Sequence, residues 1–164
     1  MIEENEALLQ KYLQLPNRLE DAIAGLNDLD LNLCNNGWTI RQIVHHVVEG
    51  ENIWQLNLRA VVGTDGILFP FTWYFALSQD EWVERWAYDK RPLGPSLALY
   101  RANTWNLAEF LRNIPGAWDH FGRVTWPGER KETRMTVREI VEMYLRHMDG
   151  HVEEIQAIRV LHQI

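Results

Sequence analysis

The sequence lacks the residues on which several classes of function depend. Among 164 residues there is one cysteine, Cys34, so an internal disulfide is excluded and a reducing cytoplasm is the expected location. The chain contains no run of about 18 apolar residues, and a membrane span is therefore not expected. Its 16 basic residues are outnumbered by 23 acidic ones, for a net charge of -7, which argues against binding to nucleic acid. The first ten residues, MIEENEALLQ, have neither the basic nor the apolar region of a signal peptide.

What the chain does contain is typical of one globular domain. Hydrophobic residues make up 46% and charged residues 24%, as in ordinary soluble proteins. The length allows a full hydrophobic core without disulfides or metals as supports, so we expect a single domain over residues 1–164. Eight tryptophans are many for this length, and we interpret most of them as core or as the lining of a pocket. Cys34 has no histidine near it in the sequence and is interpreted as a small, half-buried residue.

Apolar residues recur at helical spacing in four long segments. The first is interrupted by Pro16, which predicts either a kinked helix or two short ones. The expected segments are residues 3–27, residues 39–63, a helix from about residue 95 to 113, and a helix from residue 136 almost to the carboxyl end.

Two of these helices have well-defined starts. Thr39 with Gln42, and Thr136 with Glu139, have the spacing of capping boxes, in which each side chain of a pair satisfies a free backbone N–H group at the beginning of a helix. Residues 64–93 form a long connection rich in aromatic residues, of the kind that crosses a bundle or covers a site. Within it, Ser78 and Glu81 are placed to cap a short helix. The segment RVTWPGERKETRM, residues 123–135, has a Pro-Gly turn and predicts a small β-hairpin.

Two histidines lie four residues apart in the last helix, in the stretch RHMDGH. This spacing places the imidazoles of His147 and His151 on the same face of the helix. The zinc-protease pattern His-Glu-x-x-His does not apply, because Met148 stands where the glutamate would be. Gly150 costs the helix about 1 kcal/mol relative to alanine, and we expect it to allow close packing beside the histidines. Asp149 points away from them and is expected to be exposed.

A third histidine, His46, can join this pair under one condition. It lies roughly 10 Å from the start of its helix, and the other two average roughly 20 Å from the start of theirs. In antiparallel helices about 30 Å long the three would be level, whereas in parallel helices they would miss each other by roughly 9 Å. The neighbouring His45 points about 100° away, so we expect it to support a ligand or to lie at the surface.

Three neutral imidazoles with an open fourth position describe a catalytic metal site. Zinc and nickel are the metals we expect first, and iron and copper also accept nitrogen ligands. Glu49 and Glu154 each lie about one turn from one of these histidines. Either could orient a histidine or act on a bound water, and the alternative is that both are solvated charges on a helix surface.

Two segments resemble a known family. Residues 37–46, GWTIRQIVHH, resemble the first metal-ligand region of the DinB/YfiT-like superfamily, and residues 144–155, YLRHMDGHVEEI, resemble its last-helix His-x-x-x-His segment. The resemblance implies an all-α fold, a four-helix bundle with a long crossover between the second and third helices and a small β-hairpin before the last. It also implies antiparallel second and fourth helices, with His46, His147 and His151 as metal ligands.

The resemblance further implies two kinds of chemistry. Similar proteins include S-transferases and isomerases that use a low-molecular-weight thiol such as bacillithiol or mycothiol, and others are described as metal-dependent hydrolases. A metal can hold a thiol as thiolate, or it can lower the pKa of a bound water toward about 7. From these we favour a metal-dependent, thiol-using S-transferase acting on a small-molecule substrate. The alternatives are a metal-dependent hydrolase and a non-catalytic, stress-related binding protein. A homodimer is expected from the general frequency of dimers.

Overall fold

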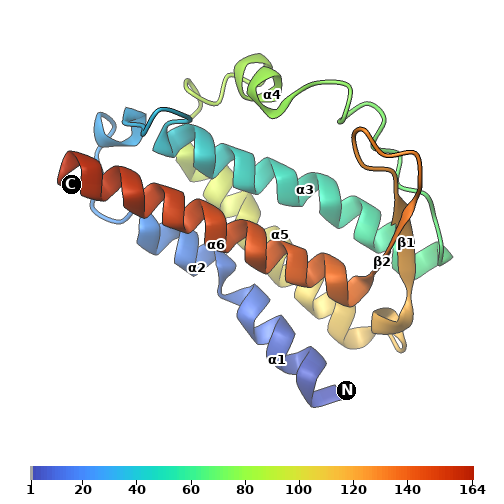
Figure 1. Ribbon diagram of the computed structural model, residues 1–164. Coiled ribbons are helices and arrows are strands. Elements are labelled where there is room, and N and C mark those ends of the chain that lie inside the picture. Colours follow the sequence, from blue (N-terminus) through green and yellow to red (C-terminus); the bar gives the residue numbers. More distant parts are fainter. Residues whose placement is uncertain (1) are drawn as a thin grey trace.

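The computed structural model describes residues 2–164 of the chain. These residues form a bundle of long helices that is closed at one end by a β-hairpin (Figure 1). The helices are α1 (Ile2–Leu13), α2 (Leu15–Ala22), α3 (Ile40–Thr64), α4 (Gln79–Arg85), α5 (Leu93–Asn113) and α6 (Val137–His162). Two short 3-10 helices, η1 (Asp30–Asn32) and η2 (Ala117–Asp119), lie in the connections, and the strands are β1 (Phe121–Val124) and β2 (Thr133–Thr136).

The bundle has four rods, because α1 and α2 together form one of them (Figure 1). This rod and α6 run in one direction, and α3 and α5 run in the other. The shared direction of α3 and α5 requires the chain to return along the bundle between them, and residues 65–92 make that crossover with α4 in its middle. The expected all-α four-helix bundle with a long crossover and a β-hairpin before the last helix is confirmed.

The predicted helix starts are confirmed by their hydrogen bonds. The side chain of Thr39 accepts from the backbone N–H of Gln42, and the Gln42 side chain accepts from the backbone N–H of Thr39. The same reciprocal pair forms between Thr136 and Glu139 at the start of α6. Each satisfied pair removes two unpaired donors from a helix terminus, and the loss of such a cap typically costs about 1 kcal/mol. Ser78 caps α4 in the same way, as expected.

Two helix boundaries depend on proline. Pro16 lies in the first turn of α2, where its missing N–H costs nothing, so the first segment is two helices and not one kinked helix. The α5 helix begins at Leu93, two residues before the expected start, because Pro95 also lies in a first turn. Cys34 is exposed, which corrects the expectation that it is half-buried.

The β-hairpin holds the crossover against the end of the bundle. Strands β1 and β2 pair antiparallel, and Leu68 of the crossover adds a parallel bridge to Arg123 on β1. Gly122 on β1 allows the ring of Phe69 in the crossover to pack against the strand, because a Cβ atom there would lie 2.4 Å from Cε1 of Phe69. Only glycine therefore fits at position 122 without a shift of the neighbouring side chains.

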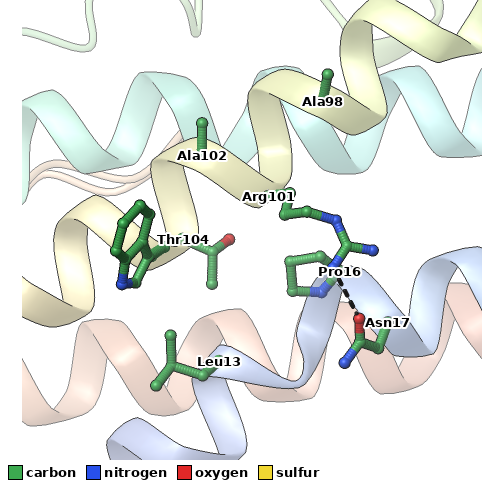
Figure 2. A pocket seen from close by; sticks show the side chains of 8 residues that line it. Leu13, Pro16, Asn17, Ala98, Arg101, Ala102 and Thr104 are labelled. Atoms are coloured by element: carbon green, nitrogen blue, oxygen red, sulfur yellow. Dashed lines mark hydrogen bonds between the residues drawn. The ribbon is translucent and has the colours of Figure 1, made fainter.

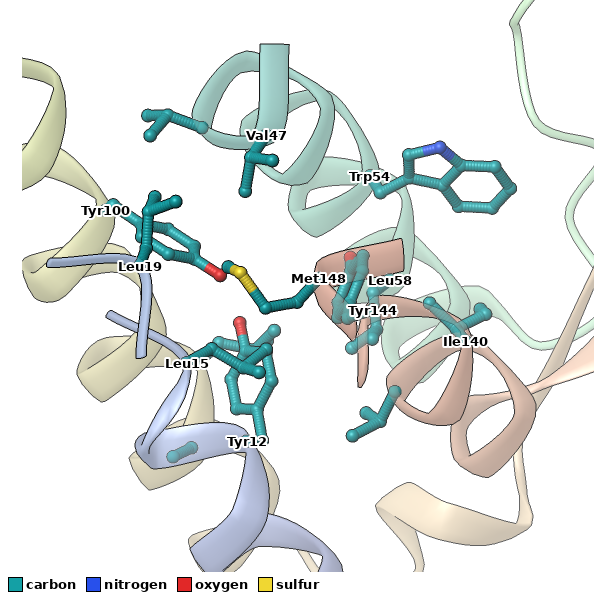
Figure 3. Packing of buried hydrophobic residues seen from close by; sticks show 14 of the residues in the cluster. Tyr12, Leu15, Leu19, Val47, Trp54, Leu58, Tyr100, Ile140, Tyr144 and Met148 are labelled. Carbon is teal, nitrogen blue, oxygen red and sulfur yellow. The ribbon is translucent and has the colours of Figure 1, made fainter. Parts of the chain in front are cut away.

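The core consists of apolar side chains that all four rods contribute (Figure 3). A band of aromatic rings joins it to the crossover, with Trp54 of α3 in contact with Phe69, Phe71 and Trp126. The tryptophans of the chain thus lie partly in this band, but Trp73 and Trp105 are exposed. Within residues 2–164, no helix combines the length and hydropathy needed to cross a lipid bilayer.

Candidate metal centre

Three histidines from two helices converge at mid-bundle. His46 comes from α3, and His147 and His151 come from α6. The Nε2 atom of His147 lies 3.1 Å from Nε2 of His46 and 3.1 Å from Nε2 of His151. All three ligand atoms lie within 4.8 Å of one another. The helices α3 and α6 are antiparallel (Figure 1), which is the arrangement in which the three histidines were expected to be level.

This spacing suits one small divalent metal ion. Nitrogen atoms bound to a tetrahedral zinc ion at about 2.0–2.1 Å lie roughly 3.3 Å from one another. The two Nε2–Nε2 distances of 3.1 Å are close to that value. The donor set of three imidazoles is one that zinc, nickel, iron and copper all accept. The residues present therefore fit a metal ion.

Burial keeps two of the three imidazoles neutral. Burial away from solvent is the main cause that lowers the pKa of His46 to about 3, and the neighbouring His147 and His151 contribute to this value in the same direction. Loss of solvent also lowers the pKa of His147 to about 4, with a contribution from His151. A neutral imidazole keeps a lone pair on one nitrogen, which is the form that binds a metal. Near pH 7 these two side chains are therefore already in the neutral form and can bind a metal ion without first losing a proton.

Glu154 fixes the orientation of His151. The Nδ1 atom of His151 lies 3.0 Å from Oε2 of Glu154, one turn further along α6. Because a carboxylate only accepts, the proton of His151 resides on Nδ1, and its Nε2 lone pair is directed at the other two histidines. Metal-binding histidines commonly have such a partner on the outer nitrogen.

Trp38 covers the histidines from the side of the crossover. Its ring centroid lies 4.7 Å from that of His46, and its ring stacks on His151 at 6.4 Å with an interplanar angle of 15°. The indole N–H of Trp38 donates to Asp80 of α4 at 2.7 Å. This hydrogen bond ties the crossover helix to the residue that covers the site.

Glu49, the other carboxylate predicted near the site, has a different partner. Its Oε1 atom accepts from the Arg91 guanidinium at 2.7 Å. The Arg91 carbonyl oxygen lies 3.1 Å from Nε2 of His45. His45 is fully buried, with Nδ1 at 3.0 Å from the Ser96 hydroxyl. His45 therefore anchors α3 to the start of α5, and the expectation that it might lie at the surface was wrong.

The two other residues noted in the RHMDGH stretch lie outside the site. Asp149 is exposed, as expected, and forms an ion pair with Arg18 of α2. Gly150 is exposed, and a Cβ atom there would have no neighbour within 4 Å, so the expected close packing is absent. The glycine that approaches the histidines is Gly50 on α3, where a Cβ atom would lie 3.8 Å from Cε1 of His147.

A cavity of about 120 Å³ opens beside His46 and His147. Most of its lining is apolar. The lining residues besides the two histidines are Gly50, Glu51, Trp54, Tyr74, Trp126, Met143 and Tyr144. The aromatic-rich connection over residues 64–93, which was expected to cross the bundle or cover a site, contributes only Tyr74 to this cavity.

Glu51 is the functional candidate that sequence reasoning missed. Its carboxyl is buried and accepts hydrogen bonds from the Tyr12 hydroxyl, from Gln55 Nε2 at 2.9 Å and from the Thr104 hydroxyl at 3.4 Å. Burial raises the pKa of Glu51 to about 7, although these hydrogen bonds oppose the rise. The one available sequence signal was a glutamate on the apolar side of a long helix, four residues before the glutamine that bonds it.

A larger cavity, of about 540 Å³, lies on another side of the bundle (Figure 2). It is an open groove between the α1–α2 junction and α5, and Figure 2 shows Leu13 and Pro16 on one side of it and Thr104 on the other. None of the residues that line the groove is a histidine or a carboxylate. The groove therefore lacks the groups that would bind a metal or transfer a proton, and the smaller cavity is the better candidate.

Comparison with known proteins places this site in a family context. Residues 8–155 match the family model described as DinB superfamily. A protein of Geobacillus thermodenitrificans named "Putative metal-dependent hydrolase" is 28% identical, over 89% of this chain and 79% of its own length. A Bacillus licheniformis protein of the same description is 28% identical, over 96% of this chain and 89% of its own length.

A solved structure shares the fold. YfiT from Bacillus subtilis, described as a probable metal-dependent hydrolase with an unusual four-helix bundle topology, superposes with a TM-score of 0.82. The match covers 98% of this chain and 89% of YfiT, at 18% sequence identity. The bundle with parallel α3 and α5 is therefore an architecture already seen in a solved protein.

Proposed function

The chain belongs to the DinB superfamily, and from that membership we propose that it is a metal-dependent hydrolase of a small-molecule substrate. The observation that carries the proposal is the convergence of three imidazole Nε2 atoms within 4.8 Å. The names of relatives that match most of the chain support the same reaction class. His46, His147 and His151 would hold the metal, with zinc or nickel expected first and iron or copper also compatible with the ligands.

The residues of the chain have separate tasks in this proposal. A bound divalent metal supplies Lewis acidity and lowers the pKa of water toward about 7. Glu154 holds the proton of His151 on Nδ1 and so keeps Nε2 free to bind. Trp38 shields two of the imidazoles from solvent, which keeps the site in a medium of low polarity and strengthens electrostatic interactions within it.

Thiol-dependent S-transfer is the second candidate, because the two carboxylates that were considered as bases for a hydrolase, Glu49 and Glu154, both have other hydrogen-bond partners. Glu49 forms an ion pair with Arg91, and Glu154 bonds His151, so each already uses a carboxylate oxygen. A transferase needs no carboxylate base if the metal holds the thiol as thiolate. Of the two roles foreseen for Glu154, orienting a histidine is the one that its contact supports.

The two reactions can be separated with one preparation of the full chain. Hydrolysis would be followed with p-nitrophenyl acetate and related small esters, and S-transfer with monochlorobimane and cysteine, glutathione or bacillithiol. Each assay would use protein loaded with zinc or nickel, with a chelator, and as the His147→Ala variant. We expect hydrolysis that needs metal and is lost in the variant. Turnover only with a thiol would favour the transferase. The absence of any chelator-sensitive turnover would favour a non-catalytic binding protein and would overturn the proposal.

A further inference from the structure

We propose that the cavity beside the histidines receives a compact, uncharged group of the substrate, and that the Tyr144 hydroxyl donates a hydrogen bond to an acceptor on that group. The inference rests on the proposed function, since it assigns this cavity to the substrate of the metal site. It adds a recognition residue and a substrate class that the three histidines do not specify.

The size and lining of the cavity limit what can enter. A cavity of about 150 Å³ with apolar walls holds one benzene molecule, and this one measures about 120 Å³. The group that enters is therefore a five-membered ring or a short branched chain. Trp54, Trp126 and Met143 supply apolar wall, and desolvation beside such a wall penalises any charged group.

Tyr144, one of the residues that line this apolar cavity, has a buried polar atom without a partner in the described part of the chain. Its side chain lines the cavity, only 4% of the residue is exposed, and its hydroxyl has no hydrogen-bond partner among residues 2–164. A buried hydroxyl without a partner destabilises the protein, because it has lost its hydrogen bonds to water without replacing them. No other buried side-chain polar atom in the described part of the chain lacks a partner. A ligand that accepts from this hydroxyl would recover that cost on binding, and this makes Tyr144 a recognition residue.

Glu51, the carboxyl group that lines the cavity, forms its hydrogen bonds with residues other than Tyr144. Its Oε1 atom already accepts from Tyr12, Gln55 and Thr104. When ionised, Glu51 repels an anionic group in the cavity, and when protonated it leaves the cavity without a fixed charge. Both states disfavour a carboxylate or phosphate at this end of the substrate.

Tyr74 offers a matched control, because it lines the same cavity but its hydroxyl donates to Gln79 Oε1 at 2.9 Å. Tyr74→Phe and Tyr144→Phe each remove one oxygen atom from a phenol ring. The two variants differ in whether that hydroxyl already has a partner.

The test measures binding of cyclopentanone, which is compact, uncharged and has one acceptor oxygen. Binding to the zinc-loaded and the metal-free full chain would be followed by ligand-observed NMR, with the change in total tryptophan fluorescence as a second readout, because Trp54 and Trp126 line the cavity. Cyclopentane and cyclopentanecarboxylate serve as the apolar and the anionic comparison. We expect the ketone to bind the metal-free wild type more tightly than cyclopentane, and the carboxylate not to bind the metal-free chain, where no cation attracts it.

In Tyr144→Phe the affinity for cyclopentanone should fall about five-fold, as expected for one lost hydrogen bond, and the affinity for cyclopentane should not change. Tyr74→Phe should leave the ketone affinity within two-fold. Equal affinity of wild type and Tyr144→Phe for the ketone, or no preference of the wild type for ketone over hydrocarbon, would overturn the proposal. The comparison of cyclopentanone with cyclopentane uses the wild type alone, so it tests the proposal even if a variant fails to fold. Binding to the metal-free chain needs no turnover, so failure of the hydrolase proposal would be recognised separately.

Discussion

The Nε2 atoms of His46 and His147 lie 3.1 Å apart, although 101 positions separate the two histidines in the chain. The contact arises because α3 and α6 run in opposite directions (Figure 1) and because Thr39 and Thr136 cap the starts of these helices. A change of one residue in either helix start would rotate a histidine by about 100° around its axis. The caps therefore set the position of the histidines as well as stabilising the helices.

Replacing one histidine should abolish metal binding. His147 is central to the cluster, since its Nε2 atom lies at 3.1 Å from each of the other two. We expect purified wild type, after dialysis against zinc or nickel, to retain about one metal ion per chain, and His147→Ala to retain almost none. Elemental analysis measures both. His120→Ala, at a histidine outside the cluster, is the control and should keep the wild-type metal content. Equal metal in His147→Ala and wild type would end the metal hypothesis.

Glu154 should influence metal affinity without touching the metal. Glu154→Gln keeps an acceptor near Nδ1 of His151 but removes the charge that fixes the proton there. Loss of such a partner typically weakens metal binding about 10–100-fold, and competition with a chelating dye would measure this. Glu153→Gln, at the exposed neighbouring position, should not change the affinity. If both variants bound zinc like the wild type, Glu154 would be a surface charge and no more.

The elements that the sequence predicted best are those set by local chemistry. A threonine followed three residues later by Gln or Glu is a local signal for a capped helix start, and both α3 and α6 begin where these pairs stand. The four-residue spacing of His147 and His151 likewise follows from helix geometry. The direction of α3 relative to α6 came from family resemblance, because helix periodicity contains no information on orientation.

The features that the sequence did not reveal depend on contacts between distant segments. His45 is buried because Ser96 and the Arg91 carbonyl, about fifty residues away, meet both of its ring nitrogens. Glu51 is buried because Tyr12 and Thr104 reach it from two other helices. The prediction of close packing at Gly150 was wrong for a related reason. The rotation of α3 relative to α6 decides which glycine lies against the histidines, and that glycine is Gly50.

Two glycine substitutions should have opposite effects on stability. At Gly122 a new methyl group would lie 2.4 Å from Phe69, and such overpacking typically costs about 1–3 kcal/mol. At Gly150, inside α6, the methyl group would meet nothing within 4 Å, and alanine favours a helix over glycine by up to about 1 kcal/mol. Urea unfolding of Gly122→Ala and Gly150→Ala would show the first less stable and the second more stable than wild type. A loss of stability in Gly150→Ala would contradict the open space seen around that residue.

The buried carboxyl of Glu51 should make stability depend on pH. Burial raises its pKa from 4.5 to about 7 in the folded protein, so the folded state binds the proton more tightly than the unfolded state does. The stabilisation is fully present below about pH 4.5 and is lost as pH rises through about 7. It amounts to at most about 3 kcal/mol, since one pKa unit corresponds to about 1.4 kcal/mol. Glu51→Gln has no proton to lose, so the free energy of unfolding of wild type minus that of the variant should fall by this amount between pH 4.5 and 8. Urea unfolding at stepped pH measures the difference, in which the contributions of the other ionisable groups cancel. A difference that stayed constant, or that grew with pH, would show that Glu51 is charged in the folded protein throughout this range.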